Sequence, residues 1–408
     1  MPDTPAVTTE AARAPAERGT GGPWLWLPAQ QQPAWSGHGD LGWVRDRLSE
    51  IPPLVAADEI DTLTADLARA AAGGARILQA GDCAEDLREC TPAHIRAKTS
   101  VLAGLGGHLR RLSGQPVVEV GRIGGQFGKP RSSPVETVDG VEVPAFRGHI
   151  VHSETPTPEA RRPDPLRMLR VHAASAAVAD RLRRERVRRG RGRSAGPGPW
   201  TSHEALVLDY EAPLVRREAD GRLLLGSTHL PWLGDRTRGL NAAHLALLGA
   251  VANPVGCKIG PAATPEDVAR LCARLDPDRA PGRLVLIVRM GRARVAEHLP
   301  GIVQAVRRGG HPVVWLSDPM HGNTVHAPDG RKTRHLDDLV AEARAFQSVL
   351  RRHRQHPGGF HLEVAASDVT ECVGGTVGGT AAIGRRYTTL CDPRLNPEQA
   401  HELLAACV

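Results

Sequence analysis

Eight short apolar runs, each ending beside a charged or metal-binding side chain, constrain the fold of this 408-residue chain more than any other feature. Segments able to form helices separate most of them. A strand followed by a crossover helix, repeated eight times, is typical of a closed parallel barrel. The sequence therefore predicts an α/β fold, a single (β/α)8 TIM barrel. The runs expected to form strands are 77–80, 117–120, 205–208, 255–257, 284–288, 313–316, 360–362 and 387–391.

The alternation of strands and helices begins near residue 75, which divides the chain into three parts. Residues 1–22 are rich in Ala, Pro, Thr and Gly and are expected to be a disordered tail. Residues 23–74 should form a short N-terminal helical extension, and residues 75–408 the catalytic barrel. A long insertion, roughly 123–202, is expected after the second strand. Helices are expected near 41–50, 56–72, 91–112, 165–189, 294–308, 336–351 and 397–406, with a further one opened by Thr264-Pro265.

Composition excludes several classes of protein. Aromatic residues make up only 3% of the chain, so the core must be aliphatic, as suits parallel strands buried on both faces. The net charge is +7, and much of the excess lies in Arg181–Arg193. That stretch lacks aromatics for base stacking, so we expect a solvated helix end and no nucleic-acid partner. Nucleic-acid binding remains an alternative from a different class of function. The seven cysteines show no disulfide spacing, and no apolar signal or membrane span is present, so a cytoplasmic protein without membrane contact is expected.

Metal-binding side chains follow four of the expected strands. In a parallel barrel all strand C-termini open into one mouth, so residues far apart in sequence should meet there. A thiol, an imidazole and two carboxylates would suit Mn²⁺, Co²⁺, Fe²⁺ or Zn²⁺ better than Mg²⁺ or Ca²⁺. A single buried Cys or His is more often structural, but four convergent candidates favour a metal site. They are Cys83, His321, Glu363 and Asp392.

A second set of side chains at the strand ends and in the mouth loops is cationic. Burying such groups without anionic partners is costly. They either pair with the carboxylates or bind phosphate and carboxylate groups of substrates, which Arg holds bidentately. The loop 128–133 adds hydroxyls and backbone amides for a second phosphate, whereas no nucleotide-binding motif is present. The set comprises Arg122, Lys129, Arg131, Arg236, Lys258 and Arg289.

Long motifs identify a family resemblance that runs in order from about residue 24 to the end. They include LQAGDCAEDL (78–87), GRIGGQFGKPRSSP (121–134), WLGDRTRGL (232–240), WLSDPMHGNT (315–324), GGFHLEV (358–364) and YTTLCDPRLN (387–396). With these motifs the chain resembles a class II (plant-type) 3-deoxy-D-arabino-heptulosonate 7-phosphate (DAHP) synthase. The resemblance implies a metal-dependent condensation of phosphoenolpyruvate with erythrose 4-phosphate and water, releasing phosphate, as the first step of the shikimate pathway.

The resemblance also implies roles for individual residues. The four metal candidates resemble the ligands of the family, with Mn²⁺ or Co²⁺ preferred, and Cys83, His321 and Lys258 are expected to be catalytic. Lys258 is a candidate for proton transfer, with a metal-bound water as its rival. The expected phosphoenolpyruvate contacts are Arg122, Lys129, Arg236, Lys258 and Arg289, and the expected erythrose-phosphate contacts are Arg131 and Ser132. Asp235, where the family commonly has Glu, joins the expected substrate-binding set. A homo-oligomer, dimer or tetramer, is implied as well.

Two alternatives remain open from the sequence. One is a synthase of the aminoDAHP type, which uses an amino or imino analogue of erythrose 4-phosphate and differs by one heteroatom on the acceptor. The other is a non-catalytic regulatory homologue, which the intact metal and cationic sets argue against. The enzyme could serve primary metabolism or feed a specialised pathway.

Overall fold

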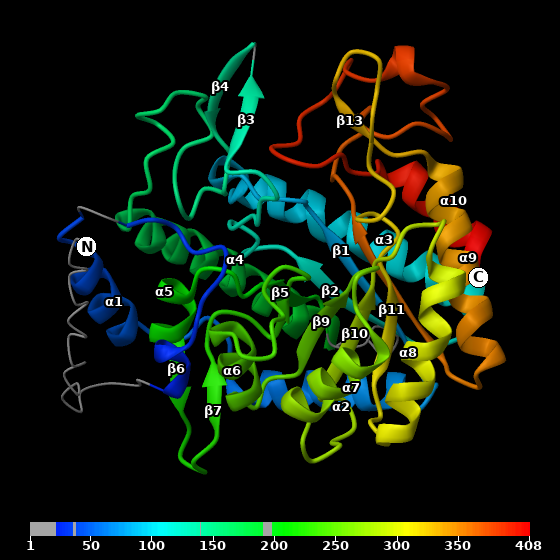
Figure 1. Cartoon of the computed structure of the whole chain (residues 1–408), viewed down its shortest axis with the longest axis horizontal. Helices are drawn as coiled ribbons and strands as arrows, with labels where there is room; N and C mark the ends of the chain where they lie inside the picture. Colours follow the sequence, from blue (N-terminus) through cyan, green and yellow to red (C-terminus); the bar gives the residue numbers. More distant parts are fainter. Residues whose placement is uncertain (1–21, 36–37, 139, 191–197) are drawn as a thin grey trace, which may run out of the picture.

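Eight parallel strands close into a barrel at the centre of the structure, a computed structural model that describes residues 22–35, 38–138, 140–190 and 198–408 (Figure 1). Around the barrel each strand pairs with two neighbours, and the last strand pairs with the first to close the ring. In barrel order from the first strand they are β1 (Arg76–Gly81), β2 (Val117–Arg122), β5 (Trp200–Glu204), β8 (Leu230–Leu233), β9 (Val255–Ile259), β10 (Leu284–Val288), β11 (Val314–Ser317) and β14 (Pro357–Glu363).

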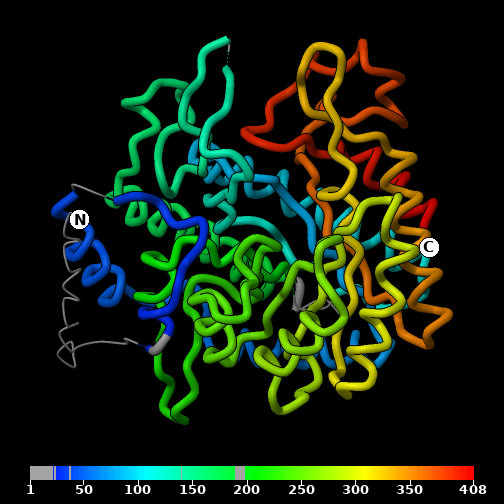
Figure 2. The backbone as a smooth tube through the Cα atoms, in the orientation of Figure 1, coloured from blue at the N-terminus to red at the C-terminus, as the bar shows by residue number. Residues whose placement is uncertain are grey.

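Helices coat the outside of the barrel because many of the strand residues that point outward are apolar. On β10, for example, Leu284, Leu286 and Val288 belong to the outer cluster, whereas Val285 and Ile287 belong to the inner one. The C-terminal helix returns beside α3, as the tube shows (Figure 2). The outer helices are α3 (Pro92–Ser113), α4 (Leu166–Gly190), α6 (Ala243–Ala250), α7 (Pro265–Leu275), α8 (Val295–Gly309), α9 (Leu336–Arg352) and α10 (Pro397–Cys407).

The interior of the barrel changes from apolar to charged along its axis. At the N-terminal end Leu63 and Leu67 of α2 (Ala57–Ala71) pack against inward-facing strand residues such as Ile77 and Val118, so this helix closes that end. On β1 and β14 the next inward residues, Gln79 and His361, face each other in register. The inward positions nearest the mouth carry charged side chains. The polar end of the barrel is therefore the C-terminal mouth.

Loops and hairpins surround this mouth. In Figure 1 the β3–β4 hairpin and the loops around β13 stand on one side of the barrel, while α2 lies on the opposite side. The N-terminal extension also contributes α1 (Leu41–Glu50), whose Val44 and Leu48 pack in a separate cluster beneath the long insertion. The minor elements are β3 (Val135–Val138), β4 (Val141–Pro144), α5 (Leu208–Glu211), β6 (Val215–Arg217), β7 (Leu223–Leu225), β12 (Val325–His326) and β13 (Lys332–Thr333).

The predicted barrel is confirmed, but two of its expected strands are misplaced and one observed strand was missed. The third strand was expected at 205–208, whereas β5 covers Trp200–Glu204 and Leu208 begins the short helix α5. The fourth strand, β8, was missed, because the chain reaches it through α5 and the β6–β7 hairpin rather than through a long helix. The run 387–391 is not a strand but part of a loop over the mouth, held by the carboxylate of Glu371.

The predicted helices agree with the observed ones to within a residue or two at each end. Thr91, Thr264 and Asn396 accept backbone hydrogen bonds as N-caps with a proline directly after them, which is why these starts could be recognised. The expected disordered tail falls almost wholly on residues outside the described part, as does the end of the Arg181–Arg193 stretch. Among the described helices none has the length and apolarity needed to cross a membrane.

Candidate active site at the barrel mouth

A cavity of about 240 Å³ lies at the C-terminal mouth, and eight Lys and Arg side chains but only three carboxylates line it. Its walls come from the ends of β2, β5, β8 and β9 and from the loops that follow β2, β8, β10, β11, β13 and β14. Every residue predicted for substrate contact lies on its surface, namely Arg122, Lys129, Arg131, Ser132, Asp235, Arg236, Lys258 and Arg289. His321 and Asp392 line it too, and Cys83 and Glu363 are buried directly beside them.

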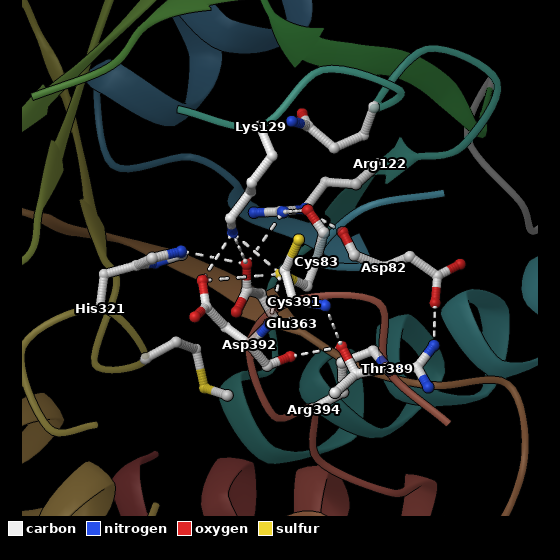
Figure 3. Close-up of polar contacts among 12 residues, drawn as sticks. Asp82, Cys83, Arg122, Lys129, His321, Glu363, Thr389, Cys391, Asp392 and Arg394 are labelled. Atoms are coloured by element: carbon white, nitrogen blue, oxygen red, sulfur yellow. Dashed lines mark hydrogen bonds and ion pairs between the residues drawn. The ribbon is translucent and has the colours of Figure 1, made fainter. Parts of the chain in front are cut away.

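Three of the four predicted metal ligands lie around the ammonium group of Lys129 (Figure 3). The Nζ atom of Lys129 is 2.9 Å from Cys83 Sγ, 2.8 Å from Asp392 Oδ2 and 3.7 Å from Glu363 Oε1. Cys83 Sγ and Asp392 Oδ2 are 3.7 Å apart. His321 reaches the same group through Glu363, because its Nε2 atom is 3.0 Å from Glu363 Oε1. A positive charge thus already sits among these donor atoms.

The contacts of His321 are those of a metal-binding imidazole. Its Nδ1 atom is 2.8 Å from Asp318 Oδ2, so this nitrogen donates its proton to the carboxylate and Nε2 keeps a lone pair. Burial lowers the pKa of His321, which favours the neutral ring. The Nε2 lone pair then lies 3.0 Å from a carboxylate oxygen of Glu363, so a metal bound beside them would meet both donor atoms. The donor set of Cys83, His321, Glu363 and Asp392 therefore fits a divalent metal.

A second group that could hold a metal overlaps the first at His321. Ligand atoms of Asp318, His321 and His361 lie within 4.8 Å of one another. However, His361 Nε2 is 2.7 Å from the donor-only guanidinium of Arg122, so its lone pair is already used. Asp318 is likewise occupied by His321 and by Lys258 Nζ at 3.2 Å. We therefore interpret Asp318 as the group that orients His321.

The carboxylates of the site are kept ionised by the cations around them. Burial alone would raise the pKa of Glu363, but the positive charges of Lys129 and Arg334 outweigh it and hold that pKa well below its usual range. Arg334, fully buried, is 2.9 Å from Glu363 Oε2. Burial opposes the charge on Lys129 as well, yet Asp392, Cys83 and Glu363 raise its pKa well above normal, so it remains an ammonium.

The predicted substrate contacts differ in how far they are already paired. Arg289 is 2.9 Å from Asp235 Oδ2, and Lys258 is engaged by Asp318. Arg131 pairs with Glu136. Arg236 is exposed, and in the described part of the chain it has no ion-pair partner. Arg236 is therefore the cation most available to an anionic ligand.

Buried carboxylates fix the loops that carry these cations. Glu85 accepts three backbone N–H groups, from Gly124, Gly125 and Gln126, in the loop that leads to Lys129. On α9, Glu342 accepts the N–H groups of Met290 and Gly291, directly after Arg289.

Glu342 also joins this loop to the loop of His321. It accepts a hydrogen bond of 2.6 Å from the side-chain amide of Asn323. The two loops touch at glycines, since a Cβ atom on Gly322 would lie 2.2 Å from the backbone nitrogen of Gly291. The mouth is consequently held in place before any ligand binds.

Sequence reasoning missed several groups of the site. Glu204 ends β5, is buried and lines the cavity, and its Oε1 atom has no hydrogen-bond partner among the described residues. Burial raises the pKa of its carboxyl group. Trp232 lines the cavity beneath the guanidinium of Arg122, 5.3 Å from its ring centroid.

Two signals could have revealed these groups. Glu204 would have appeared as a strand end had β5 been placed correctly, and Asp318 stands three residues before His321. Lys332 and Arg334 gave no signal, because the short β13 hairpin that brings them to the cavity has no recognisable pattern.

Comparison with known proteins agrees with this arrangement. Residues 20–190 and 193–408 match the class-II DAHP synthetase family. The chain is 47% identical over 372 residues to a Pseudomonas fluorescens protein named "Probable phospho-2-dehydro-3-deoxyheptonate aldolase", covering 91% of this chain and 92% of that one. It is 40% identical to the phospho-2-dehydro-3-deoxyheptonate aldolase of Streptomyces coelicolor, covering 97% and 98%. The solved structure of the Francisella tularensis protein of that name shares the fold, with a TM-score of 0.51 at 14% identity over 89% of this chain and 96% of that chain.

Proposed function

Because the chain belongs to the class-II DAHP synthetase family, we propose that it condenses phosphoenolpyruvate with erythrose 4-phosphate and water to give DAHP and phosphate. This reaction is the first step of the shikimate pathway. The long motifs around Lys129 and His321 support the plant-type assignment within the family.

The observation that carries this proposal is the excess of cations in one cavity. Both substrates are phosphorylated, and phosphoenolpyruvate also carries a carboxylate, so three anionic groups must be bound together. Eight Lys and Arg side chains against three carboxylates provide that environment. Arg122, Lys129, Arg236, Lys258 and Arg289 would hold phosphoenolpyruvate, and Arg131 with Ser132, on the loop after β2, would hold the phosphate of the aldose.

A divalent metal would be held by Cys83, His321, Glu363 and Asp392. When bound, the metal supplies a Lewis acid that polarises the aldehyde carbonyl or activates a water. Mn²⁺ or Co²⁺ suits the mixed set of sulfur, nitrogen and oxygen donors, and Zn²⁺ or Fe²⁺ can also use it. Arg122 and Arg334 support the site by binding the two oxygens of Glu363.

The reaction forms a bond between C3 of phosphoenolpyruvate and the aldehyde carbon, adds water at C2 and breaks the bond between C2 and the phosphate oxygen. The aldehyde oxygen gains a proton and the water loses one. Lys258, whose pKa is lowered by burial, is placed to donate a proton. Glu204, which lines the same cavity and has one unpaired carboxyl oxygen, is a candidate to accept the proton of the water.

We further propose that the enzyme is a cytoplasmic homo-oligomer. All seven cysteines are free, as a reducing compartment requires. Trp26 and Trp43 in the N-terminal extension are 70% and 58% exposed, which supports a contact between copies there. Light scattering coupled to gel filtration tests this, and a mass of 43.6 kDa would refute it.

The decisive experiment follows phosphate release with phosphoenolpyruvate and erythrose 4-phosphate, first after chelation and then with Mn²⁺ or Co²⁺ restored. We expect turnover only with metal. An amino analogue of erythrose 4-phosphate, assayed in parallel, identifies the acceptor. The absence of turnover with either acceptor and any divalent metal would favour a non-catalytic homologue.

A further inference from the structure

A chain of polar side chains crosses the interior of the barrel one layer below the cavity. Gln79 of β1, Ser202 of β5 and His361 of β14 are each fully buried. The same layer of a parallel barrel is normally filled by aliphatic side chains. Polar groups at this depth are costly unless every one of them is hydrogen-bonded. We therefore looked for a role of these side chains other than packing the core.

The hydrogen bonds of this chain can run in one direction only. Arg122 can only donate, so His361 Nε2, 2.7 Å from Arg122 Nη1, accepts. The proton of the neutral ring is then on Nδ1, which donates to Gln79 Oε1 over 2.8 Å. The amide nitrogen of Gln79 donates to Ser202 Oγ over 3.0 Å, and that hydroxyl donates to the carbonyl of Gly121 over 3.1 Å. Gln79 thereby sets the tautomer of His361.

This tautomer determines how Arg122 is presented to the cavity. The Nε atom of Arg122 donates to the carbonyl of Asp82, and its Nη2 atom donates to the carbonyl of Cys83 and to Glu363 Oε1. With one Nη1 proton on His361, four of the five guanidinium N–H groups are engaged. The fifth, on Nη1, has no partner in the described part of the chain, and Arg122 lines the cavity.

The surroundings keep His361 neutral and its ring fixed. The ring packs edge-on against Trp232, with centroids 5.3 Å apart. The Nε2 atom faces the donor-only guanidinium of Arg122, which leaves no acceptor there for a second ring proton. A charged ring would place a second donor against the guanidinium.

We propose that His361 is a positioning residue for substrate binding: its Nε2 atom, in the tautomer set by Gln79, holds Arg122 so that one N–H group faces an oxyanion of phosphoenolpyruvate. This inference rests on the proposed function. His361 does not touch the substrate itself but acts through Arg122.

The test compares His361→Leu with His361→Gln, whose amide oxygen can replace Nε2 as the acceptor. The dissociation constant for phosphoenolpyruvate is measured by calorimetry on the metal-loaded enzyme, and the KM of each substrate by phosphate release. We expect His361→Leu to weaken phosphoenolpyruvate binding about tenfold or more, the loss typical of one hydrogen bond to a charged group, while the KM for erythrose 4-phosphate stays unchanged. His361→Gln should recover binding to within about threefold of wild type.

A matched control separates positioning from stability. His229 is equally buried and precedes β8, at the opposite end of the barrel, where it is bonded to Thr201. His229→Leu should lower the melting temperature without changing phosphoenolpyruvate binding. If His361→Leu does not fold, Gln79→Leu takes its place and should weaken binding in the same direction.

Distinct results overturn the two proposals. Failure of the wild-type enzyme to bind phosphoenolpyruvate refutes the proposed function. The positioning role is refuted if wild type binds phosphoenolpyruvate and His361→Leu binds it with the same affinity. It is also refuted if His361→Leu and His361→Gln lose affinity equally. The ¹⁵N spectrum of histidine-labelled protein, with that of His361→Gln subtracted, should show a ring protonated on Nδ1, and protonation on Nε2 would also refute it.

Discussion

Replacing Lys129 by Met should make the enzyme bind its metal more tightly. The ammonium of Lys129 lies among three of the four proposed ligands, 2.8 Å from Asp392 Oδ2 and 2.9 Å from Cys83 Sγ. A metal that takes these donors must displace the ammonium from them. The wild-type metal affinity is therefore reduced by the cost of separating Lys129 from Asp392 and Cys83.

The size of the effect follows from the hydrogen bonds that the metal must break. A hydrogen bond to a charged group contributes about 1.5 to 3 kcal/mol. We assign the cost of only one of the two short hydrogen bonds, since the displaced Lys129 can pair elsewhere in the cavity. At about 1.4 kcal/mol for each factor of ten, Lys129→Met should lower the metal dissociation constant by about 10- to 100-fold. Removing a positive charge 3.7 Å from Glu363 acts in the same direction.

The assay is a titration of substrate-free, metal-stripped protein with Mn²⁺ in competition with a chelating dye. Lys332→Met is the matched control, because Lys332 also pairs with Asp392, over 2.8 Å, but through the other oxygen and with 35% of its side chain exposed. Its effect should stay below about threefold. Unchanged or weaker Mn²⁺ binding in folded Lys129→Met, or an equal gain in both variants, would refute the reasoning.

Three further predictions concern Glu342, Glu204 and the pair Arg236 and Arg334. Burial raises the pKa of Glu342 to about 7, so the folded protein holds a proton that the unfolded chain releases at lower pH. The stability of wild type relative to Glu342→Gln should therefore fall by about 3 kcal/mol as the pH rises from below 4.5 to above 7. An equal difference in unfolding free energy between the two proteins at pH 5 and at pH 8, measured with urea, would contradict this. In a steady-state assay of phosphate release, Glu204→Gln should lower kcat by about 100-fold or more with little change in the KM for phosphoenolpyruvate. An unchanged kcat would exclude Glu204 from proton transfer. Arg236→Ala should raise the KM for phosphoenolpyruvate about tenfold without lowering the melting temperature, and a destabilised Arg236→Ala would show that Arg236 has a structural partner. Arg334→Ala, by contrast, should destabilise the fold, because it removes the partner of Glu363 Oε2.

Local patterns were sufficient for most of the secondary structure. The helices that begin at Pro92, Pro265 and Pro397 were recognisable because cap residues, prolines and apolar periodicity act within a few neighbouring residues. β8 was missed because it has only four residues and follows a hairpin instead of a helix. Where strands and helices do not alternate, a short apolar run cannot be assigned to a barrel strand from its sequence.

The sequence by itself determined which side chains meet. In a parallel barrel every strand ends at the same mouth, so a polar residue directly after an apolar run has its place fixed by topology alone. This holds for Arg122, Lys258, Arg289 and Glu363. Their proposed chemical roles rest on residue type and on the resemblance to the family, and remain to be measured.

Only the tertiary structure decided how these side chains pair. That Lys129 rather than Arg131 lies among the proposed ligands, and that His361 binds Gln79 across 282 positions of sequence, depends on the closure of β14 against β1. Such pairings result from competition between desolvation and hydrogen bonding in a buried space. That competition has no counterpart in the unfolded chain, where the same groups are solvated independently, and so it leaves no pattern in the sequence.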